Sequence, residues 1–128
     1  MERITKQGTA ILNAIEKAHR PLLAQEILEA AACDSPGIGQ ATVYRNIKAL
    51  VEGGLLSTVH LPGENPRYEV SHLHHHHHFH CTLCNKVYDV HDCPGDLKQL
   101  APAGFQVERH EVTLYGRCAA CKIGRAHV

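Results

Sequence analysis

The chain has 128 residues, a length that suits one domain or two small ones. Thirteen Lys and Arg residues balance thirteen Asp and Glu residues, so the net charge is zero when the histidines are neutral. This balance lacks the strongly basic field that marks binding to nucleic acid or membrane. With 44% hydrophobic and 20% charged residues, the composition is that of a folded protein and excludes wholesale disorder.

No apolar run approaches the ~20 residues needed to cross a bilayer, and no charged-then-apolar leader opens the chain. We therefore expect a soluble, cytoplasmic protein. Twelve histidines and six cysteines are many for this length, and ten of the histidines and five of the cysteines follow residue 67. In a reducing compartment, paired cysteines hold metal more often than they form disulfides. The composition predicts an ordinary first half and a metal-binding second half.

Helical spacing of apolar residues, with capping and turn residues between the segments, predicts three helices in the first half. The expected helices run from Thr5 to about Ala18–Arg20, from Leu22 (after Pro21) to about Ala32, and from about Gln40 to Gly53. Two strands should follow, Leu55–Leu61 and Arg67–Val70, on either side of a turn at Pro62–Pro66. This order predicts a winged helix-turn-helix, and its third helix has the length that fits the major groove of DNA.

Polar side chains on the third helix project away from its apolar face, where Arg and Lys can reach phosphates or guanine edges. Residues 1–66 carry six Lys and Arg against seven Asp and Glu, a net charge of −1, so DNA contact would depend on local positive charges and helix N-termini. A solvated helix face explains the same pattern. The candidates for DNA contact are Arg3, Lys6, Gln40, Thr42, Tyr44, Arg45 and Lys48.

Two Cys-x-x-Cys pairs, separated by 33 residues, mark the second half. Thiolates at this spacing converge tetrahedrally on one Zn²⁺, and four sulfurs close the site to water and substrate. A pair of redox dithiols is the alternative, but the flanking residues lack the βαβ pattern typical of such sites. We expect a structural zinc ion held by Cys81, Cys84, Cys118 and Cys121.

The residues around these pairs predict a small α+β unit. Strand-like alternation covers Phe79–Val90 and Val107–Tyr115, and a short helix is expected between Cys93 and Ala101. So small a unit has too few apolar residues to fold without its metal.

A histidine-rich run from His72 to His80 precedes the first cysteine pair. In a strand, alternate side chains point to opposite sides, so His76 and His78 would share one side and His75 and His77 the other. Two metal sites could draw on this run, and a solvated low-complexity tract is the alternative. Nitrogen and oxygen ligands suit Zn²⁺, Fe²⁺, Mn²⁺ or Ni²⁺ without discriminating among them. The available partners are Glu69, Asp89, Asp96 and His110.

Motifs in both halves resemble, in the same order, those of the ferric uptake regulator family. They are Gly39–Arg45 (GQATVYR), Arg67-Tyr-Glu69, His75–His80 running into Cys81, and His110 followed by Leu114-Tyr-Gly and the second cysteine pair. The resemblance covers nearly the whole chain. It implies a homodimeric, metal-responsive repressor that binds a palindromic operator in double-stranded DNA. The implied domains are a DNA-binding domain (1–70), a hinge and metal-binding segment (71–78) and a dimerisation and metal-binding domain (79–128).

The resemblance also implies roles for individual residues. The paired cysteines match the family's structural zinc site, and Tyr44, Arg45 and Arg3 match residues that read DNA. The sensing site would contain Glu69, His76, His78 and Asp89. Pro21 occupies the position of the family's usual histidine, so either His19, two residues earlier, is a further ligand or the site has fewer ligands. The second site would contain His75, His77, Asp96 and His110. The family often has an acid at the position of His77, so this site would have more nitrogen ligands.

The sensed metal stays open among Fe²⁺, Zn²⁺ and Mn²⁺, with iron first and zinc next, because a site of nitrogen and oxygen ligands alone fits iron. In the family that the chain resembles, Glu at the position of Glu69 is typical of metal sensors, whereas Asp there is typical of peroxide sensors. Cys93 could add a thiolate and favour zinc, or could be a small residue before Pro94; Cys33 is expected in a turn. A zinc-specific or peroxide-responsive member of the family is one alternative, and a zinc-ribbon storage or interaction protein is another. An enzyme is disfavoured because the four-cysteine set is closed and no His-x-Glu segment precedes a Pro-Cys-x-x-Cys.

Overall fold

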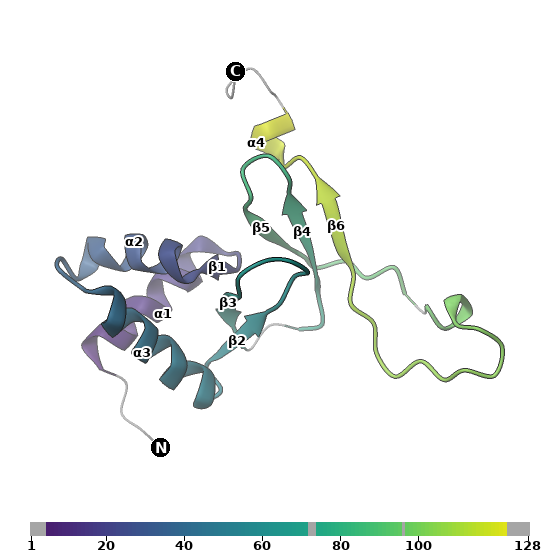
Figure 1. Cartoon of the computed structure of the whole chain (residues 1–128), viewed down its shortest axis with the longest axis horizontal. Helices are drawn as coiled ribbons and strands as arrows, with labels where there is room; N and C mark the ends of the chain where they lie inside the picture. Colours follow the sequence, from purple (N-terminus) through teal and green to yellow (C-terminus); the bar gives the residue numbers. More distant parts are fainter. Residues whose placement is uncertain (1–4, 72–73, 96, 123–128) are drawn as a thin grey trace. The chain divides into compact units, whose positions relative to one another are not determined.

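The computed structural model describes residues 5–71, 74–95 and 97–122. The chain forms two compact units, residues 1–73 and 74–128, each of which contains a three-stranded sheet (Figure 1). This α+β architecture is the predicted fold class. In the described parts of the chain, no helix is long and apolar enough to cross a membrane. The segment 71–78, expected as a hinge, includes the first residues of a strand in the second unit.

Three helices make up most of the first unit: α1 (Lys6–Ala18), α2 (Ala24–Asp34) and α3 (Gln40–Glu52). Thr5 caps α1, because its hydroxyl oxygen accepts the Gly8 N–H at 2.9 Å. His19 ends α1 in the left-handed conformation, with φ at 55°. The first and third helices are therefore confirmed close to their predicted limits.

The predicted start of the second helix is wrong by two residues. Leu22 and Leu23 form a short strand, β1, which pairs antiparallel with β3 (Arg67–Val70). The helix α2 begins only at Ala24, where the Glu26 carboxylate accepts the Leu23 N–H at 2.9 Å. Leucine spacing in the sequence does not reveal this pairing, because the partner strand lies more than 40 residues further along the chain.

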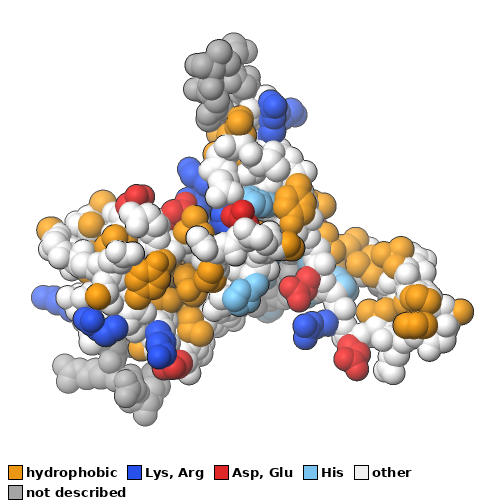
Figure 2. Space-filling view, viewed as in Figure 1, with side chains coloured by type: hydrophobic (Ala, Val, Ile, Leu, Met, Phe, Trp, Pro, Cys, Tyr) orange, Lys and Arg blue, Asp and Glu red, His pale blue; other side chains and the backbone are white. Residues whose placement is uncertain are grey.

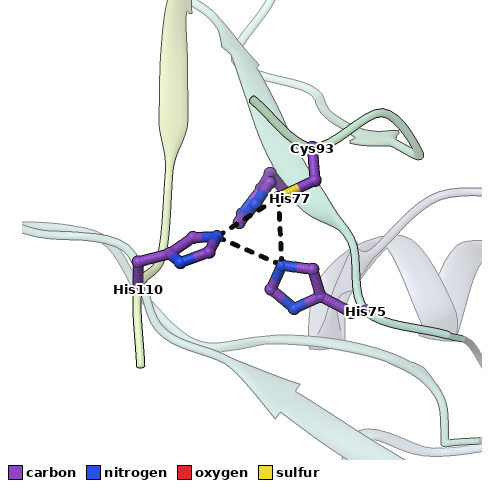
Figure 3. Close-up of side chains that lie close together, drawn as sticks. All are labelled: His75, His77, Cys93 and His110. Carbon is purple, nitrogen blue, oxygen red and sulfur yellow. Dashed lines mark hydrogen bonds between the residues drawn. The ribbon is translucent and has the colours of Figure 1, made fainter. Parts of the chain in front are cut away.

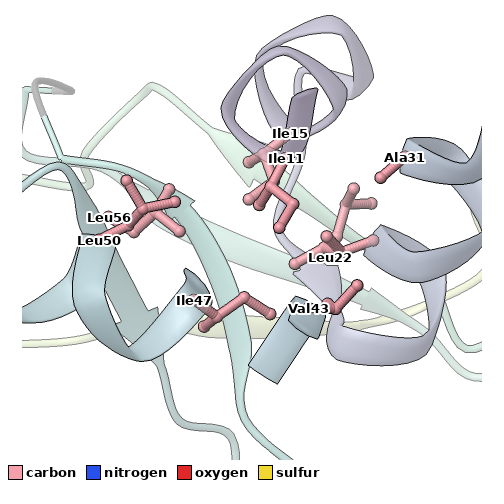
Figure 4. Packing of buried hydrophobic residues seen from close by; sticks show 9 residues of the cluster. Ile11, Ile15, Leu22, Ala31, Val43, Ile47, Leu50 and Leu56 are labelled. Carbon is pink, nitrogen blue, oxygen red and sulfur yellow. The ribbon is translucent and has the colours of Figure 1, made fainter. Parts of the chain in front are cut away.

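The predicted wing is confirmed: β2 (Leu56–Val59) pairs antiparallel with β3 along its whole length, and the sheet order is β1-β3-β2. Aliphatic side chains from the helices, β1 and β2 form the core of the first unit (Figure 4). Burial of each large aliphatic side chain contributes about 1.5–3 kcal/mol. The core residues are Ile11, Ile15, Leu22, Ile27, Ala31, Val43, Ile47, Leu50 and Leu56.

The second unit is built on a sheet of order β5-β4-β6. In it β4 (His77–Cys81) pairs antiparallel with β5 (Val87–Val90) and parallel with β6 (Thr113–Gly116). The four-residue helix α4 (Ala119–Lys122) follows β6. The strand predicted from Val107 is thus shorter than expected, because its pairing with β4 begins only at Val112, whose carbonyl accepts the His78 N–H.

The helix predicted between Cys93 and Ala101 is reduced to one 3₁₀ turn, η1 (Lys98–Leu100). Gly95, with φ at 97°, stands outside the helical region just before it. Leu100 and Phe105 in this segment are 75% and 71% exposed, and hydrophobic side chains gather over it on the face shown in Figure 2. These apolar side chains therefore do not contribute to a core.

The core of the first unit makes a direct prediction about stability. Ile27 is fully buried, so Ile27→Ala removes apolar contacts and leaves a cavity that costs about 2–5 kcal/mol of unfolding free energy. Glu29→Ala, on the exposed side of the same helix, should change it by less than about 0.5 kcal/mol. Urea denaturation of both variants measures the difference, and equal midpoints would contradict this packing.

Candidate metal centres

The four paired cysteines meet at one end of the second sheet. Because β4 and β6 are parallel, with Cys81 opposite Gly116, the two Cys-x-x-Cys segments follow the same ends of neighbouring strands. The four sulfur atoms all lie within 4.8 Å of one another, and the Cys84 and Cys118 sulfurs are 3.8 Å apart. A tetrahedron with Zn–S bonds of about 2.3 Å has edges of about 3.8 Å. The sulfur separations therefore match those of a zinc site, and none of the four thiols is in a disulfide.

Backbone donors lower the pKa of thiols in this cluster, whereas burial raises it. The N–H groups of Cys84 and Cys118 both donate to the Cys81 sulfur at 3.4 Å, and the bond from Cys84 is the main cause that lowers the pKa of Cys81 to about 5. The Cys121 N–H likewise lowers the pKa of Cys118. Burial raises the pKa of Cys121 to about 12. Without a cation the cluster thus favours a thiolate at Cys81 and a protonated thiol at Cys121, whereas Zn²⁺ stabilises four thiolates.

A second group of ligands lies on one face of β4 and β5. His78 is opposite Asp89 in the register of these strands. The Nε2 atoms of His76 and His78 are 3.5 Å and 3.6 Å from the same oxygen of Asp89. Nδ1 of His76 donates to the His74 carbonyl at 2.7 Å, so the lone pair of a neutral ring is on Nε2, next to Asp89. Two imidazoles and a carboxylate at these distances can ligate one divalent cation.

The other two residues expected in the sensing site belong to the first unit. Glu69 is on β3 opposite Ser57 and is only 6% exposed. His19 is exposed at the end of α1. Their ligation of the sensed metal stays a prediction.

A third group gathers His75, His77, Cys93 and His110 on the opposite side of β4 (Figure 3). His77 is the most buried of the four, at 3% exposed, and its Nδ1 accepts the Val112 N–H at 3.1 Å. Burial, with His75 and His110 close by, lowers the pKa of His77, so its ring is neutral near pH 7. Asp96, the acid expected in this site, lies outside the described residues, and Cys93 occupies the cluster.

The candidate DNA-reading side chains lie on the outer face of α3. Val43, Ile47 and Leu50 face the core of the first unit. Tyr44 is 49% exposed, and Arg45 and Lys48 are also exposed. Half-buried Thr42 accepts a hydrogen bond from the Arg45 guanidinium at 3.3 Å. Arg3 lies outside the described residues, so its role stays a prediction.

A winged helix followed by a sheet with clustered cysteines and histidines defines a class of metal-dependent transcriptional regulators. A family model described as "Ferric uptake regulator family" matches residues 2–115. The chain therefore belongs to the ferric uptake regulator family, and it is a metal-dependent regulator of transcription.

Curated relatives and solved structures agree with this family. The peroxide-responsive repressor PerR of Staphylococcus saprophyticus is 33% identical over 123 residues, which cover 94% of this chain and 82% of the relative. PerR of Staphylococcus epidermidis is 32% identical, and the match covers 94% of this chain and 81% of that relative. The iron-containing ferric uptake regulator of Francisella tularensis has a TM-score of 0.74 and 25% identity, covering 94% of this chain and 95% of that one. The Vibrio cholerae ferric uptake regulator has a TM-score of 0.71 and 28% identity, and the match covers 91% of this chain and 92% of that one.

The four-cysteine cluster predicts a strict dependence on zinc. Cys118→Ser should remove about one zinc ion per chain and unfold the second unit, because a structural zinc site supplies about 10–16 kcal/mol of apparent binding free energy. Cys33→Ser, at an exposed position of α2, should keep both the zinc and the fold. Metal analysis with circular dichroism tests both variants. A folded Cys118→Ser protein with its full zinc content would show that the cluster is not a structural site.

Proposed function

We propose that this chain is a cytoplasmic repressor that binds a palindromic DNA operator as a homodimer when a divalent cation, foremost Fe²⁺, occupies a sensing site. The proposal depends chiefly on one observation, the convergence of His76 and His78 on one oxygen of Asp89. These nitrogen and oxygen donors fit Fe²⁺, and they also fit Zn²⁺ and Mn²⁺. A bound cation would supply the positive charge that holds the three side chains in one arrangement.

Glu69 is our proposed fourth ligand. It belongs to the wing of the DNA-binding unit, whereas the two histidines and Asp89 belong to the second unit. If Glu69 ligates the same cation, metal binding becomes coupled to the DNA-binding unit. A shift from 1% to 99% of a DNA-competent state requires about 5.5 kcal/mol of differential metal binding, which several coordinate bonds can supply.

For DNA contact we propose the outer face of α3. A helix of 13 residues is about 20 Å long, enough to cross a major groove. Exposed Arg45 and Lys48 can reach phosphates or guanine edges, and Tyr44 can contact a thymine methyl group. In a dimer, two copies of α3 would read half-sites about 34 Å apart or a multiple of that distance.

The second unit supports the proposed dimer. In its described residues β6 pairs with β4 along one edge, and Leu114 and Tyr115 on β6 are 48% and 55% exposed. Exposed apolar side chains on an edge strand are typical of an interface with another chain.

Peroxide response is the second candidate function, because the curated relatives at 33% and 32% identity are peroxide-responsive repressors. The resemblance to the family links such sensing to Asp at the position of Glu69. We therefore expect hydrogen peroxide to leave the metal-binding histidines unoxidised, which peptide mass spectrometry of the iron-loaded protein measures. Oxidation of His76 or His78 would favour the peroxide sensor.

The sensing site predicts that operator binding depends on metal. With sequences selected from a random duplex pool, Fe²⁺ should tighten binding by about 5- to 150-fold, the usual range of allosteric coupling. His76→Ala should fold but lose this response, whereas His74→Ala should keep it, because the exposed His74 ring is in neither histidine cluster. Anaerobic fluorescence anisotropy with and without chelator measures the coupling. Equal affinity in both conditions would contradict the proposal.

The proposed DNA face makes a separate prediction. Arg45→Ala should weaken operator binding by about 1–3 kcal/mol without changing the metal content, because the side chain is exposed on α3. Lys17→Ala removes a similar charge from the exposed side of α1 and should have little effect. Anisotropy at several salt concentrations measures both variants. Similar losses in the two would indicate nonspecific electrostatics instead of recognition by α3.

A further inference from the structure

The cluster around Cys93 contains a ligand type that the proposed sensing site lacks. The Cys93 sulfur is 3.6 Å from Nε2 of His75 and 3.3 Å from Nε2 of His110, and these two nitrogens are 3.3 Å apart (Figure 3). The three atoms come from the segment before β4, the segment after β5 and the segment before β6. Three chain segments therefore bring one sulfur and two nitrogens into a small triangle.

The dimensions of this triangle match one face of a tetrahedral metal site. Bonds of about 2.0–2.1 Å to nitrogen and about 2.3 Å to sulfur give N–N edges of about 3.3–3.4 Å and N–S edges of about 3.5–3.6 Å. The measured separations agree with these values to within about 0.3 Å. No large movement of the side chains is needed for all three atoms to contact one cation.

His77 provides an independent indication of a ligand. Its ring centroid is 4.6 Å from that of His75 and 5.1 Å from that of His110. Its Nδ1 accepts the Val112 N–H, while Nε2 is buried and has no hydrogen-bond partner among the residues that the structure describes. An unpaired buried nitrogen costs about 1–3 kcal/mol. Because Nδ1 accepts the Val112 N–H, Nε2 of the neutral ring carries the proton. For Nε2 to bind a cation, this proton leaves to solvent while Nδ1 takes up a proton and loses the Val112 bond, and the coordinate bond then takes the place of the missing partner of Nε2.

We propose that Cys93 is the thiolate ligand of a second metal site, completed by His75, His77 and His110, that selects Zn²⁺ over Mn²⁺. The sulfur takes the role that the resemblance to the family gives to the acid Asp96. This exchange changes the class of metal, because thiolate with imidazole suits Zn²⁺ whereas carboxylates and water suit Mn²⁺. The proposal goes beyond the sensing function, and it holds whichever metal occupies the His76–His78–Asp89 group.

Cobalt spectroscopy separates this site from the other two. The protein is prepared with one zinc ion per chain in the four-cysteine cluster, and Co²⁺ is then added. Only a site with sulfur gives a thiolate-to-cobalt charge-transfer band, and the proposed sensing site has nitrogen and oxygen ligands alone. We expect the band to saturate within two equivalents, because Co²⁺ also binds the proposed sensing site, to disappear in Cys93→Ser and to persist in the matched variant Cys33→Ser, with the zinc content unchanged.

Alkylation tests the preference for zinc within one molecule, because Cys33 and Cys93 are both exposed. With free Zn²⁺ at about ten times its Kd, iodoacetamide should modify Cys93 about tenfold more slowly, because only the unoccupied fraction reacts. The alkylation rate at Cys33 should not change, and Mn²⁺ at the same free concentration should protect neither thiol. A cobalt band that survives in Cys93→Ser, or an unchanged alkylation rate at Cys93 with Zn²⁺, would show that Cys93 is an ordinary residue before Pro94.

Discussion

The second unit depends on the convergence of four cysteine sulfurs at one end of its sheet. Among the described residues, its core cluster consists of Cys81, Cys118 and Cys121, packed against Phe79, Cys84 and Tyr88. The first unit, in contrast, has a core of nine buried aliphatic residues from three helices and two strands. Apolar burial is therefore sufficient to explain the first unit, whereas we predict that the second needs a cation among its sulfurs to fold.

The sheet that carries the cysteine cluster at one end also positions the histidines. Alternate residues of a strand point to opposite sides, so one run of histidines supplies two different groups of ligands. His78 is set against Asp89 by the pairing of β4 with β5, while His77 faces His110 from the segment before β6. A change of register by one residue would exchange the two groups. A metal ion in the four-cysteine cluster would therefore act on the two groups of histidine ligands by fixing the sheet that carries them.

Much of the fold could be predicted from local patterns. Apolar spacing and capping residues predict α1 and α3, because they depend on residues close together in the sequence. Each Cys-x-x-Cys pair is also a local pattern, and the match between the two pairs identifies the four sulfurs although 33 residues separate them. The strand β1 was missed because its two leucines pair with Arg67 and Tyr68. The expected helix after Cys93 proved to be a single 3₁₀ turn, since turn residues interrupt the helical pattern. Cys93 stayed ambiguous in the sequence because its neighbours His75 and His110 are 18 and 17 residues away.

X-ray absorption at the zinc edge, on protein purified without added metal, tests the central claim most directly. With one zinc ion per chain, the account predicts a first shell of four sulfur atoms at about 2.3 Å, with no nitrogen or oxygen neighbours. A first shell dominated by nitrogen and oxygen, or folded protein in which these sulfurs are joined in disulfides, would contradict it.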